Sequence, residues 1–200
     1  MVVAHKLTNR GLATRRRIIE GAAQECRSRG AHLTTLDHVM ARTRTSKSQL
    51  FHYFPNGKEQ LFLEVAAYEA RRVLDDQQPH LSNLKTWAAW QCWRDAVVER
   101  YRSRGPLCPM AGMMAVVGRS TPGAQAISTN LFREWRASIV AGIHAMQEAG
   151  EIAESVDAER AGAALLAGIQ GGVGILMSAG DLSYLEAALD EGIEALRRAQ

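Results

Sequence analysis

One stretch, residues 34–54, limits what this chain can fold into more than any other part of the sequence. It contains two signals for the start of a helix. Thr34 with Asp37, and Ser46 with Gln49, each have the form of a capping box, in which side chains bond the amides that the first turn of a helix leaves open. The stretch therefore predicts two short helices, from Thr34 to about residue 43 and from Ser46 onward, joined by a polar turn.

Helices of about two turns do not persist alone in water, so this pair must pack on a third helix. Residues 14–30 supply one, because apolar residues recur there at helical spacing and a glycine stands at the end. On the second short helix we expect Leu50, Phe51 and Phe54 to face inward. Pro55 then ends that helix. The apolar face of the third helix consists of Ile18, Ile19, Ala22, Ala23 and Cys26.

The outward side of the second short helix carries side chains that donate or accept hydrogen bonds and no acidic group. Lys47 can reach a phosphate or a guanine edge, and Gln49 can pair with adenine. Taken alone, such a face is also typical of a helix that is merely solvated. We expect DNA contacts from Thr34, Thr35, Arg44, Thr45, Ser46, Lys47, Ser48, Gln49, His52, Tyr53 and Lys58.

Charge separates the N-terminal part from the rest of the chain. Residues 1–60 contain eleven Lys and Arg against four Asp and Glu, so they carry +7 in a chain whose net charge is +3. Such a basic segment is typical of a polyanion binder, whose affinity falls with salt. Arg15 to Arg17 lie in the predicted first turn of their helix, where a phosphate partner would offset the helix dipole. Asn56 and Lys58 open the next helix and predict an anion site there.

Two blocks of this sequence resemble the N-terminal domain of the TetR family of bacterial transcriptional regulators. They are residues 14–36, with T-R-R-R-I-I-E-G-A-A and R-G-A-H-L-T-T-L, and residues 46–61, with S-K-S-Q-L-F-H-Y-F-P-N-G-K-E-Q-L. The pattern F-P-N-G-K-E and the later G-P-L-C-P-M resemble the lincomycin-resistance-regulator-like subgroup. The resemblance implies an all-α fold with a helix-turn-helix DNA-binding domain at 1–61 and a helical effector-binding and dimerisation domain at 62–200.

The same resemblance implies a function. Family members are repressors that bind palindromic DNA operators as homodimers and are released by a small effector, so we expect this chain to do the same. It departs from the family pattern in the turn, where Arg44 and Thr45 replace the usual Gly and Val, and at Phe51, where Tyr is common. A positive φ at Arg44 would cost about 1 kcal/mol, tolerable if its guanidinium gains a phosphate. The operator sequence cannot be carried over from relatives.

The rest of the chain also predicts helices, in agreement with an all-α class in which Pro is scarce. Ser183 with Glu186 forms another capping-box pattern. The three cysteines, at 26, 92 and 108, contain no Cys-x-x-Cys pair, and no signal-peptide pattern opens the sequence, so we expect a reducing, cytoplasmic location. The expected helices span about residues 57–76, 81–102, 109–117, 122–149, 157–179 and 183–198.

Residues 161–180 carry no charge, which is also the composition of a membrane span. Few of them are strongly hydrophobic and glycine is abundant, so we favour a soluble helix. With the last helix it suits a four-helix interface in a two-fold dimer, as the family resemblance implies; a core helix of a monomer is the alternative. The expected interface residues are Leu165, Gly168, Ile169, Gly172, Leu176, Leu185, Leu189 and Ile193.

Large aromatic and methionine side chains gather between residues 87 and 135. Such side chains line pockets and also fill cores. Because the family carries an effector cavity among these helices, we expect a hydrophobic or cationic organic effector there. The expected ligand-binding residues are Trp87, Trp90, Trp93, Tyr101, Cys108, Met110, Met113, Met114 and Trp135.

Three other functions remain open from sequence alone. A small helical enzyme could use Cys108 and a histidine, Cys108 could be a thiol-based sensor, and the basic head could coat DNA without sequence preference. No His-Glu-x-x-His metal motif and no glycine-rich phosphate loop after a strand occurs in the sequence. We therefore expect no catalysis, no metal and no cofactor.

Overall fold

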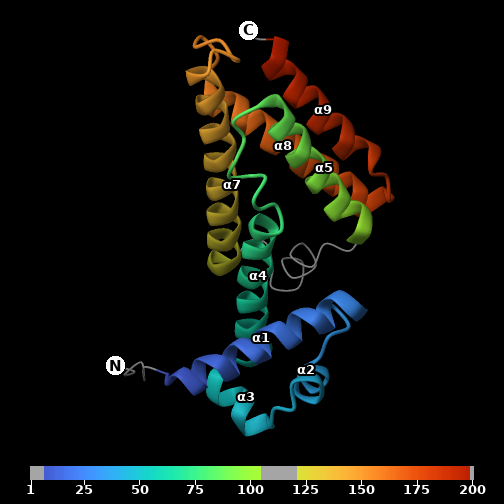
Figure 1. Cartoon of the computed structure of the whole chain (residues 1–200). Coiled ribbons are helices and arrows are strands. Elements are labelled where there is room, and N and C mark those ends of the chain that lie inside the picture. The colour runs from blue at the N-terminus through green and yellow to red at the C-terminus, as the bar shows by residue number, and fades with distance from the viewer. Residues whose placement is uncertain (1–6, 105–120, 199–200) are drawn as a thin grey trace. The chain divides into compact units, whose positions relative to one another are not determined.

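The computed structural model describes residues 7–104 and 121–198, and every regular element within these ranges is an α-helix (Figure 1). The all-α class is therefore confirmed. Contacts divide the described chain into an N-terminal unit, residues 7–70 with 121–127, and a C-terminal unit, residues 71–104 with 128–198. The N-terminal unit is longer than the domain expected at 1–61, because the next part of the fourth helix packs into its core. The expected helix at 109–117 lies outside the described residues.

Helix α1 spans Asn9–Arg29 and begins about one turn before the sequence pattern indicates. Thr8 caps it, with its Oγ1 accepting a hydrogen bond of 3.2 Å from the Gly11 amide. Gly30 closes the other end, donating its amide to the Cys26 carbonyl at 3.0 Å. Since the helix starts at Asn9, Arg15 to Arg17 lie beyond its first turn. The prediction that they lie in the first turn and oppose the helix dipole there was therefore wrong.

Helix α2 spans Leu36–Thr43 and is capped by Thr35, not by Thr34 as predicted. The Thr35 Oγ1 accepts from the His38 amide at 3.2 Å, while the Thr35 amide donates to His38 Nδ1 at 3.3 Å. A histidine, whose Nδ1 can accept a hydrogen bond, thus closes the box that we assigned to Asp37. Thr34 is buried instead, and its hydroxyl donates to the Gly30 carbonyl at 2.9 Å.

Helix α3 spans Lys47–Tyr53, and Ser46 is its N-cap as predicted, accepting from the Gln49 amide at 3.2 Å. Leu50 and Phe54 are fully buried, but Phe51 is 39% exposed. The expectation that Phe51 faces inward was therefore wrong. One helical turn places it on the same side as Lys47, away from the two buried residues.

Helix α4 spans Gly57–Asp75 and runs from the N-terminal unit into the C-terminal unit. At its start the Asn56 amide donates to Gln60 Oε1 at 3.1 Å, so Gln60 rather than Glu59 bonds back to the turn. The first half of α4 supplies apolar side chains to the same core as α1 and α3.

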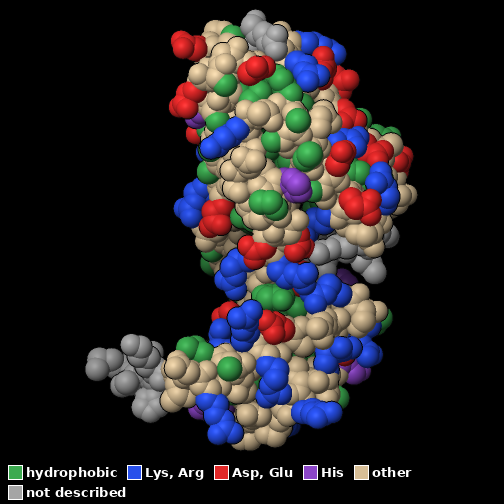
Figure 2. All heavy atoms as spheres, viewed as in Figure 1, with side chains coloured by type: hydrophobic (Ala, Val, Ile, Leu, Met, Phe, Trp, Pro, Cys, Tyr) green, Lys and Arg blue, Asp and Glu red, His purple; other side chains and the backbone are tan. Residues whose placement is uncertain are grey.

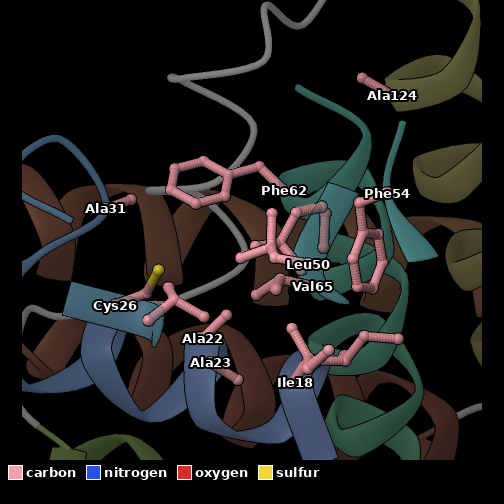
Figure 3. Packing of buried hydrophobic residues seen from close by; sticks show 14 residues of the cluster. Ile18, Ala22, Ala23, Cys26, Ala31, Leu50, Phe54, Phe62, Val65 and Ala124 are labelled. Carbon is pink, nitrogen blue, oxygen red and sulfur yellow. The ribbon is translucent and has the colours of Figure 1, made fainter. Parts of the chain in front are cut away.

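The core of the N-terminal unit forms where one face of α1 meets α2, α3 and α4 (Figure 3). The predicted apolar face of α1 is confirmed, because all five of its residues are buried. Gly21 has no side chain, which permits α2 to pack closely: a Cβ there would overlap the Thr43 side chain. The best-buried members of this core are Ile18, Ala22, Ala23, Val39, Leu50, Phe54, Leu61, Phe62, Val65, Ala66 and Ala124.

The C-terminal unit contains α5 (Trp87–Arg104), the greater part of α7 (Pro122–Glu148), α8 (Ala158–Ala179) and α9 (Ser183–Arg198). Three of these agree with the predicted ranges to within one residue. Helix α5 starts six residues later than expected, where the Thr86 hydroxyl accepts from the Ala89 amide at 3.2 Å.

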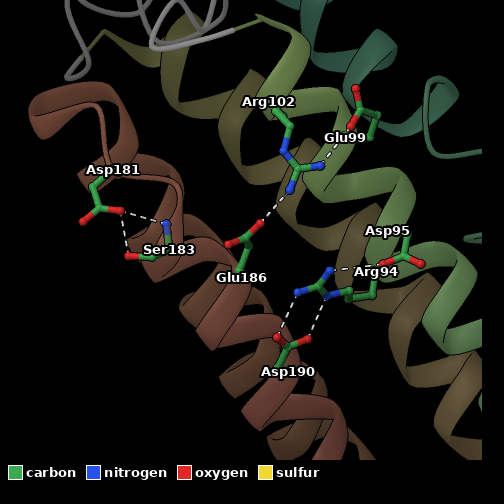
Figure 4. A network of polar contacts seen from close by, with 8 residues as sticks. All are labelled: Arg94, Asp95, Glu99, Arg102, Asp181, Ser183, Glu186 and Asp190. Carbon is green, nitrogen blue, oxygen red and sulfur yellow. Dashed lines mark hydrogen bonds and ion pairs between the residues drawn. The ribbon is translucent and has the colours of Figure 1, made fainter.

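Polar contacts join α5 to α9 and organise the turn before α9 (Figure 4). Arg94 binds both carboxylate oxygens of Asp190, at 2.7 and 2.8 Å. Asp181 accepts from the Ser183 amide at 2.9 Å and from its hydroxyl at 2.6 Å, which holds the Asp181 pKa below its usual range. Glu186 pairs with Arg102 at 2.7 Å, so the predicted capping box of Ser183 and Glu186 was wrong.

Helices α8 and α9 pack side by side (Figure 1). Gly172 permits the close approach, since a Cβ there would lie 2.5 Å from the Leu185 Cα. Length and composition alone would let α8 cross a membrane, but most of its large apolar residues are buried within the C-terminal unit. Burial of that face is typical of a core helix in a soluble protein.

Candidate nucleic-acid interface

The exposed face of α3 carries most of the side chains expected to contact DNA. Ser46, Lys47, Ser48 and His52 are exposed. Gln49 and Tyr53 are half-buried, and the Tyr53 ring meets the His52 ring edge to face, with centroids 5.0 Å apart. Leu50 and Phe54 anchor the opposite side of α3 in the core. The helix is therefore fixed from beneath while its polar side remains accessible.

The turn between α2 and α3 is held in an unusual backbone conformation. Arg44 has φ 49° and ψ 47°, a left-handed conformation that the family pattern gives to glycine, and its side chain is exposed. Its amide donates to the Met40 carbonyl as the helix cap. The positive φ that we considered for Arg44 is confirmed, at a cost of about 1–2 kcal/mol.

Two residues of the predicted DNA-contacting set are buried instead. Thr45 is 5% exposed, and its Oγ1 accepts a hydrogen bond of 2.8 Å from the Thr43 hydroxyl. Thr34 is fully buried beneath the start of α2. Both hydroxyls form hydrogen bonds within the N-terminal unit, and neither side chain is accessible to DNA. Thr35 is exposed, although its hydroxyl already caps α2.

Helix α1 braces α2 through polar contacts that sequence reasoning missed. The Arg17 guanidinium donates to the Thr43 carbonyl, one of the carbonyls that the end of α2 leaves open. Glu25, 4% exposed, binds Arg42 of α2 and also Arg29 at 2.6 Å. The hydrogen bond from Arg42 holds the pKa of Glu25 below its usual range. These contacts fix the orientation of α2, and through the turn that of α3.

Many of the basic residues in the N-terminal unit are neutralised by carboxylates. Arg15 pairs with Glu64, Arg16 with Glu20 and Arg27 with Glu69. Lys and Arg side chains still dominate the charged surface of the N-terminal unit that is visible in Figure 2. Within the described part of this unit, the cations without an acidic partner are Arg10, Arg17, Arg44, Lys47 and Lys58.

Lys58 lies in the first turn of α4, where we predicted an anion site. Its side chain is half-buried, with Nζ 4.9 Å from the centre of the Phe62 ring. Gly57 next to it has φ 65°. The ammonium group is thus positioned by an aromatic face, close to the end of α3 in sequence.

The tryptophans expected to bind a ligand are in the interior of the C-terminal unit. Trp90, Trp93 and Trp135 are at most 1% exposed, and Tyr101 is 7% exposed. Trp93 donates to Gln77 Oε1 at 2.8 Å, whereas Nε1 of Trp90 and of Trp135 has no hydrogen-bond partner among the described residues. Trp87 is half-buried and donates to Glu151 at 2.9 Å. The other expected ligand residues, Cys108, Met110, Met113 and Met114, lie outside the described residues.

The residues predicted to form a dimer interface are used within the chain instead. Seven of the eight are buried, because the large apolar residues hold α8 against its neighbours, and beyond Arg160 every exposed residue of α8 is small. The corrected residues are Leu165, Ile169, Gly172, Leu176, Leu185, Leu189 and Ile193; Gly168 is half-buried, with a potential Cβ contact of 3.3 Å to Ala188. The exposed face of α8 consists of Ala164, Ala167, Gly171, Gly174 and Ser178.

The described residues offer little for metal or thiol chemistry. No group of three or more His, Cys, Asp or Glu in ranges 7–104 and 121–198 could hold a metal ion. Cys26 is buried, and that burial raises the pKa of its thiol, so it is unsuited to react. Cys92 is exposed, and Cys108 is not among the described residues.

Known proteins resemble this chain in sequence. Residues 18–65 match the family model of bacterial regulatory proteins, tetR family. An uncharacterised HTH-type transcriptional regulator, YxaF of Bacillus subtilis (strain 168), is 34% identical over 67 residues, which is 34% of this chain and 35% of YxaF. The chain spans about a third to a half of the length of the curated relatives it matches.

Solved structures resemble nearly the whole chain in fold. A TetR transcription regulator from Haloarcula marismortui ATCC 43049 has a TM-score of 0.80 at 17% identity, over 94% of this chain and 98% of that one. SmeT, the repressor of the Stenotrophomonas maltophilia multidrug efflux pump SmeDEF, solved in complex with triclosan, has a TM-score of 0.66 at 20% identity, over 92% of this chain and 91% of SmeT. At these identities the likeness concerns the fold.

Proposed function

This chain belongs to the TetR family of bacterial regulatory proteins, and on that basis we propose that it is a DNA-binding transcriptional regulator whose helix α3 enters the major groove. The observation that carries the proposal is the exposed side of α3, which is polar apart from Phe51, has no acidic group and is anchored from beneath. An α-helix with its side chains is about 10–12 Å in diameter, which fits a major groove about 12 Å wide.

The side chains on and beside this face would have two roles, contacts with base edges and contacts with phosphates. Lys47, Ser48 and Gln49 lie in the first turn of α3, the part of a recognition helix that contacts base edges. Arg44 and Lys58, which stand before and after α3 and have no acidic partner, suit phosphate oxygens. Binding through such contacts weakens as salt rises.

We further propose that two copies act together on a palindromic operator, with their α3 helices about 34 Å apart. Support comes from the outward face of α8, which is uncharged from Ala164 to Ser178. No atom of the described residues lies within 4 Å of the positions where Gly171 and Gly174 would carry a Cβ. A face of small residues permits close approach of a second helix, as two-fold dimers of helical proteins require.

The proposed regulator is a repressor that a small hydrophobic effector releases from DNA. The buried indole N–H groups of Trp90 and Trp135 find no partner in the part of the chain that the structure describes, which supports a ligand that carries a hydrogen-bond acceptor, because an unpaired buried donor costs about 1–3 kcal/mol. The fold relative SmeT forms a complex with triclosan, a small organic molecule. Since α4 runs from one unit into the other, a ligand-dependent shift of α4 would change the spacing of the two α3 helices.

This function belongs in the cytoplasm, where promoter DNA is found. A catalytic function has less support: the relatives are transcriptional regulators, and Cys26, the buried thiol, is unreactive. The thiol-sensor alternative rests on Cys108, and alkylation of that residue without any change in DNA binding would exclude it.

A footprint on the DNA upstream of this protein's own gene tests the proposal. We expect protection of a bounded inverted repeat that disappears when salt rises from about 50 to 200 mM. The matched control is Lys85→Ala, an exposed lysine of the C-terminal unit, which should leave the footprint unchanged. Uniform coating of the fragment would favour a nonspecific DNA-binding protein, and no protection at any salt would contradict the proposal.

A further inference from the structure

The centre of the exposed face of α3 is an aromatic ring. Successive residues of an α-helix turn by about 100°, so Phe51 lies about 40° from Lys47 and about 60° from Ser48, between the two. His52 continues the same face. Phe51 is 39% exposed, one of few large apolar side chains among the described residues to reach the surface to that degree.

The fold does not require this ring in its core. Leu50 and Phe54 already occupy the buried side of α3, with no exposed surface. The Phe51 ring rests instead against the turn into α4, where a Cβ on Gly57 would lie 3.5 Å from its Cε1. A ring with two rotatable bonds, supported on one side, is a rigid surface that presents carbon atoms outward.

From this placement we propose that Phe51 determines sequence preference by packing on the 5-methyl group of a thymine in the major groove. The inference rests on the proposed function, since it takes α3 to be the helix that enters the groove. In that groove only thymine presents a methyl group, while guanine, adenine and cytosine present hydrogen-bonding atoms at their edges. The methyl group is the largest apolar group among these edges, and it is the one that a phenyl ring suits best.

The ring also acts against the other bases. A polar base edge beneath Phe51 would lose its water without gaining a partner, which is costly for any donor or acceptor removed from solvent. Phe51 therefore selects thymine both by favourable apolar contact and by exclusion of polar edges. The sequence preference of this α3 helix then differs from that of a recognition helix with tyrosine at this position, because the tyrosine hydroxyl could bond a phosphate or a base.

The test uses full-length protein and a duplex selected by that protein from a random DNA pool. Each thymine of the selected duplex is replaced in turn by uracil, which removes only the 5-methyl group. At one position in each half-site we expect the dissociation constant to rise about four-fold, the effect of uncovering one buried methyl group. For Phe51→Ala we expect weaker binding to the selected duplex and no response to uracil at that position.

Controls keep the outcomes separate. Since the Phe51 ring is 39% exposed and rests on the turn into α4, Phe51→Ala should lower the melting temperature but remain folded at the temperature of the binding assay, which circular dichroism checks; Phe51→Leu keeps an apolar contact and should retain part of the response to uracil. The proposal is overturned if no thymine-to-uracil replacement weakens the wild type, or if Phe51→Ala responds as the wild type does. Failure of the proposed function would look different, because the protein would then select no duplex from the pool at all.

Discussion

The two units of this molecule use similar residues for opposite purposes. In the N-terminal unit, large apolar residues form one compact core, and the polar side of α3 is left free. In the C-terminal unit, aromatic and leucine side chains that resemble a binding site or an interface are buried within the chain. The polar residues of a capped helix thus indicate most of its exposed face, with Phe51 as the exception, whereas an apolar cluster does not reveal whether its partner is the same chain, a second chain or a ligand.

The reason for this difference is the range of the interactions. A helix cap involves residues about three apart, so a short sequence pattern indicates where a helix begins, as at Ser46, although it named the wrong cap at Thr34. A packed apolar face involves residues far apart in the chain, and the sequence alone does not specify which element covers it. Substitutions in the two units should therefore differ in their effects on stability and on DNA binding.

The largest effect is expected at the contact between α8 and α9. Gly172→Ala places a methyl group 2.5 Å from the Leu185 Cα, a backbone contact that no side-chain rotation can relieve. We expect a loss of about 1–3 kcal/mol in the free energy of unfolding, measured by urea denaturation. The matched control is Gly171→Ala, where a Cβ would meet none of residues 7–104 and 121–198 within 4 Å. Equal stability of the two variants would contradict the packing described for this pair.

A second comparison uses two tryptophans that pack edge to face, with ring centroids 5.8 Å apart. Replacing either by phenylalanine removes the same atoms, but Trp93→Phe also leaves Gln77 Oε1 buried without its donor. We expect Trp93→Phe to be less stable than Trp90→Phe by about 1–3 kcal/mol. Thermal and chemical denaturation of both variants would measure this difference. A larger loss for Trp90→Phe would show that its N–H group has a partner in solution.

The N-terminal unit should respond to pH through Glu25. Its ion pairs lower the folded-state pKa, so the stabilisation is complete above the ordinary glutamate value of about 4.3 and is lost as pH falls through the folded-state value. We expect Glu25→Gln to lower the melting temperature at neutral pH and to match the wild type more closely in acid. Circular dichroism melts at both pH values test this. A difference between the two proteins that stays constant with pH would contradict the role of the charge.

The smallest effect on stability is expected at the turn before α3. Arg44→Gly removes the side chain from a left-handed residue and should stabilise the protein by about 1 kcal/mol. If the guanidinium binds a phosphate, the same change should weaken DNA binding and reduce the slope of log affinity against log salt concentration by about one. Gain in stability with loss of binding distinguishes function from folding at this residue. If stability and DNA affinity changed in the same direction, Arg44 would not be a DNA-contacting residue.

Much of the fold could be predicted from the sequence. The starts and ends of α7, α8 and α9 are marked by Pro122, Asp157, Gly180 and Ser183, and the caps at Ser46 and Gly30 follow from local chemistry. The residues that carry the family resemblance, 14–36 and 46–61, lie within the N-terminal unit of the structure. The N-cap of α2 is Thr35 and not Thr34, which was not predicted because either of two adjacent threonines can cap a helix. The two are distinguished only by the hydrogen bond that the buried Thr34 hydroxyl donates to the Gly30 carbonyl.

The site was predicted less completely than the fold. Side-chain types placed Lys47, Ser48 and His52 on the exposed face, but the exposure of Phe51 depends on how α3 is rotated against the core. The bracing contact from Arg17 to Thr43 spans 26 residues and has no local pattern. The expected dimer residues failed because leucines that pack α8 on α9 are indistinguishable, by type and spacing, from leucines that pack one chain on another.

Specific recognition of DNA by α3 can be measured as the preference of the protein for one duplex over another. The dissociation constants of the wild type and of Lys47→Ala with Gln49→Ala are measured for the selected duplex and for a scrambled duplex of equal composition. We predict that the wild type prefers the selected duplex by about 1,000-fold or more, and that the double variant loses most of this preference while its melting temperature is unchanged. A double variant that keeps the full preference would contradict the account, because α3 would then not be the element that reads the DNA.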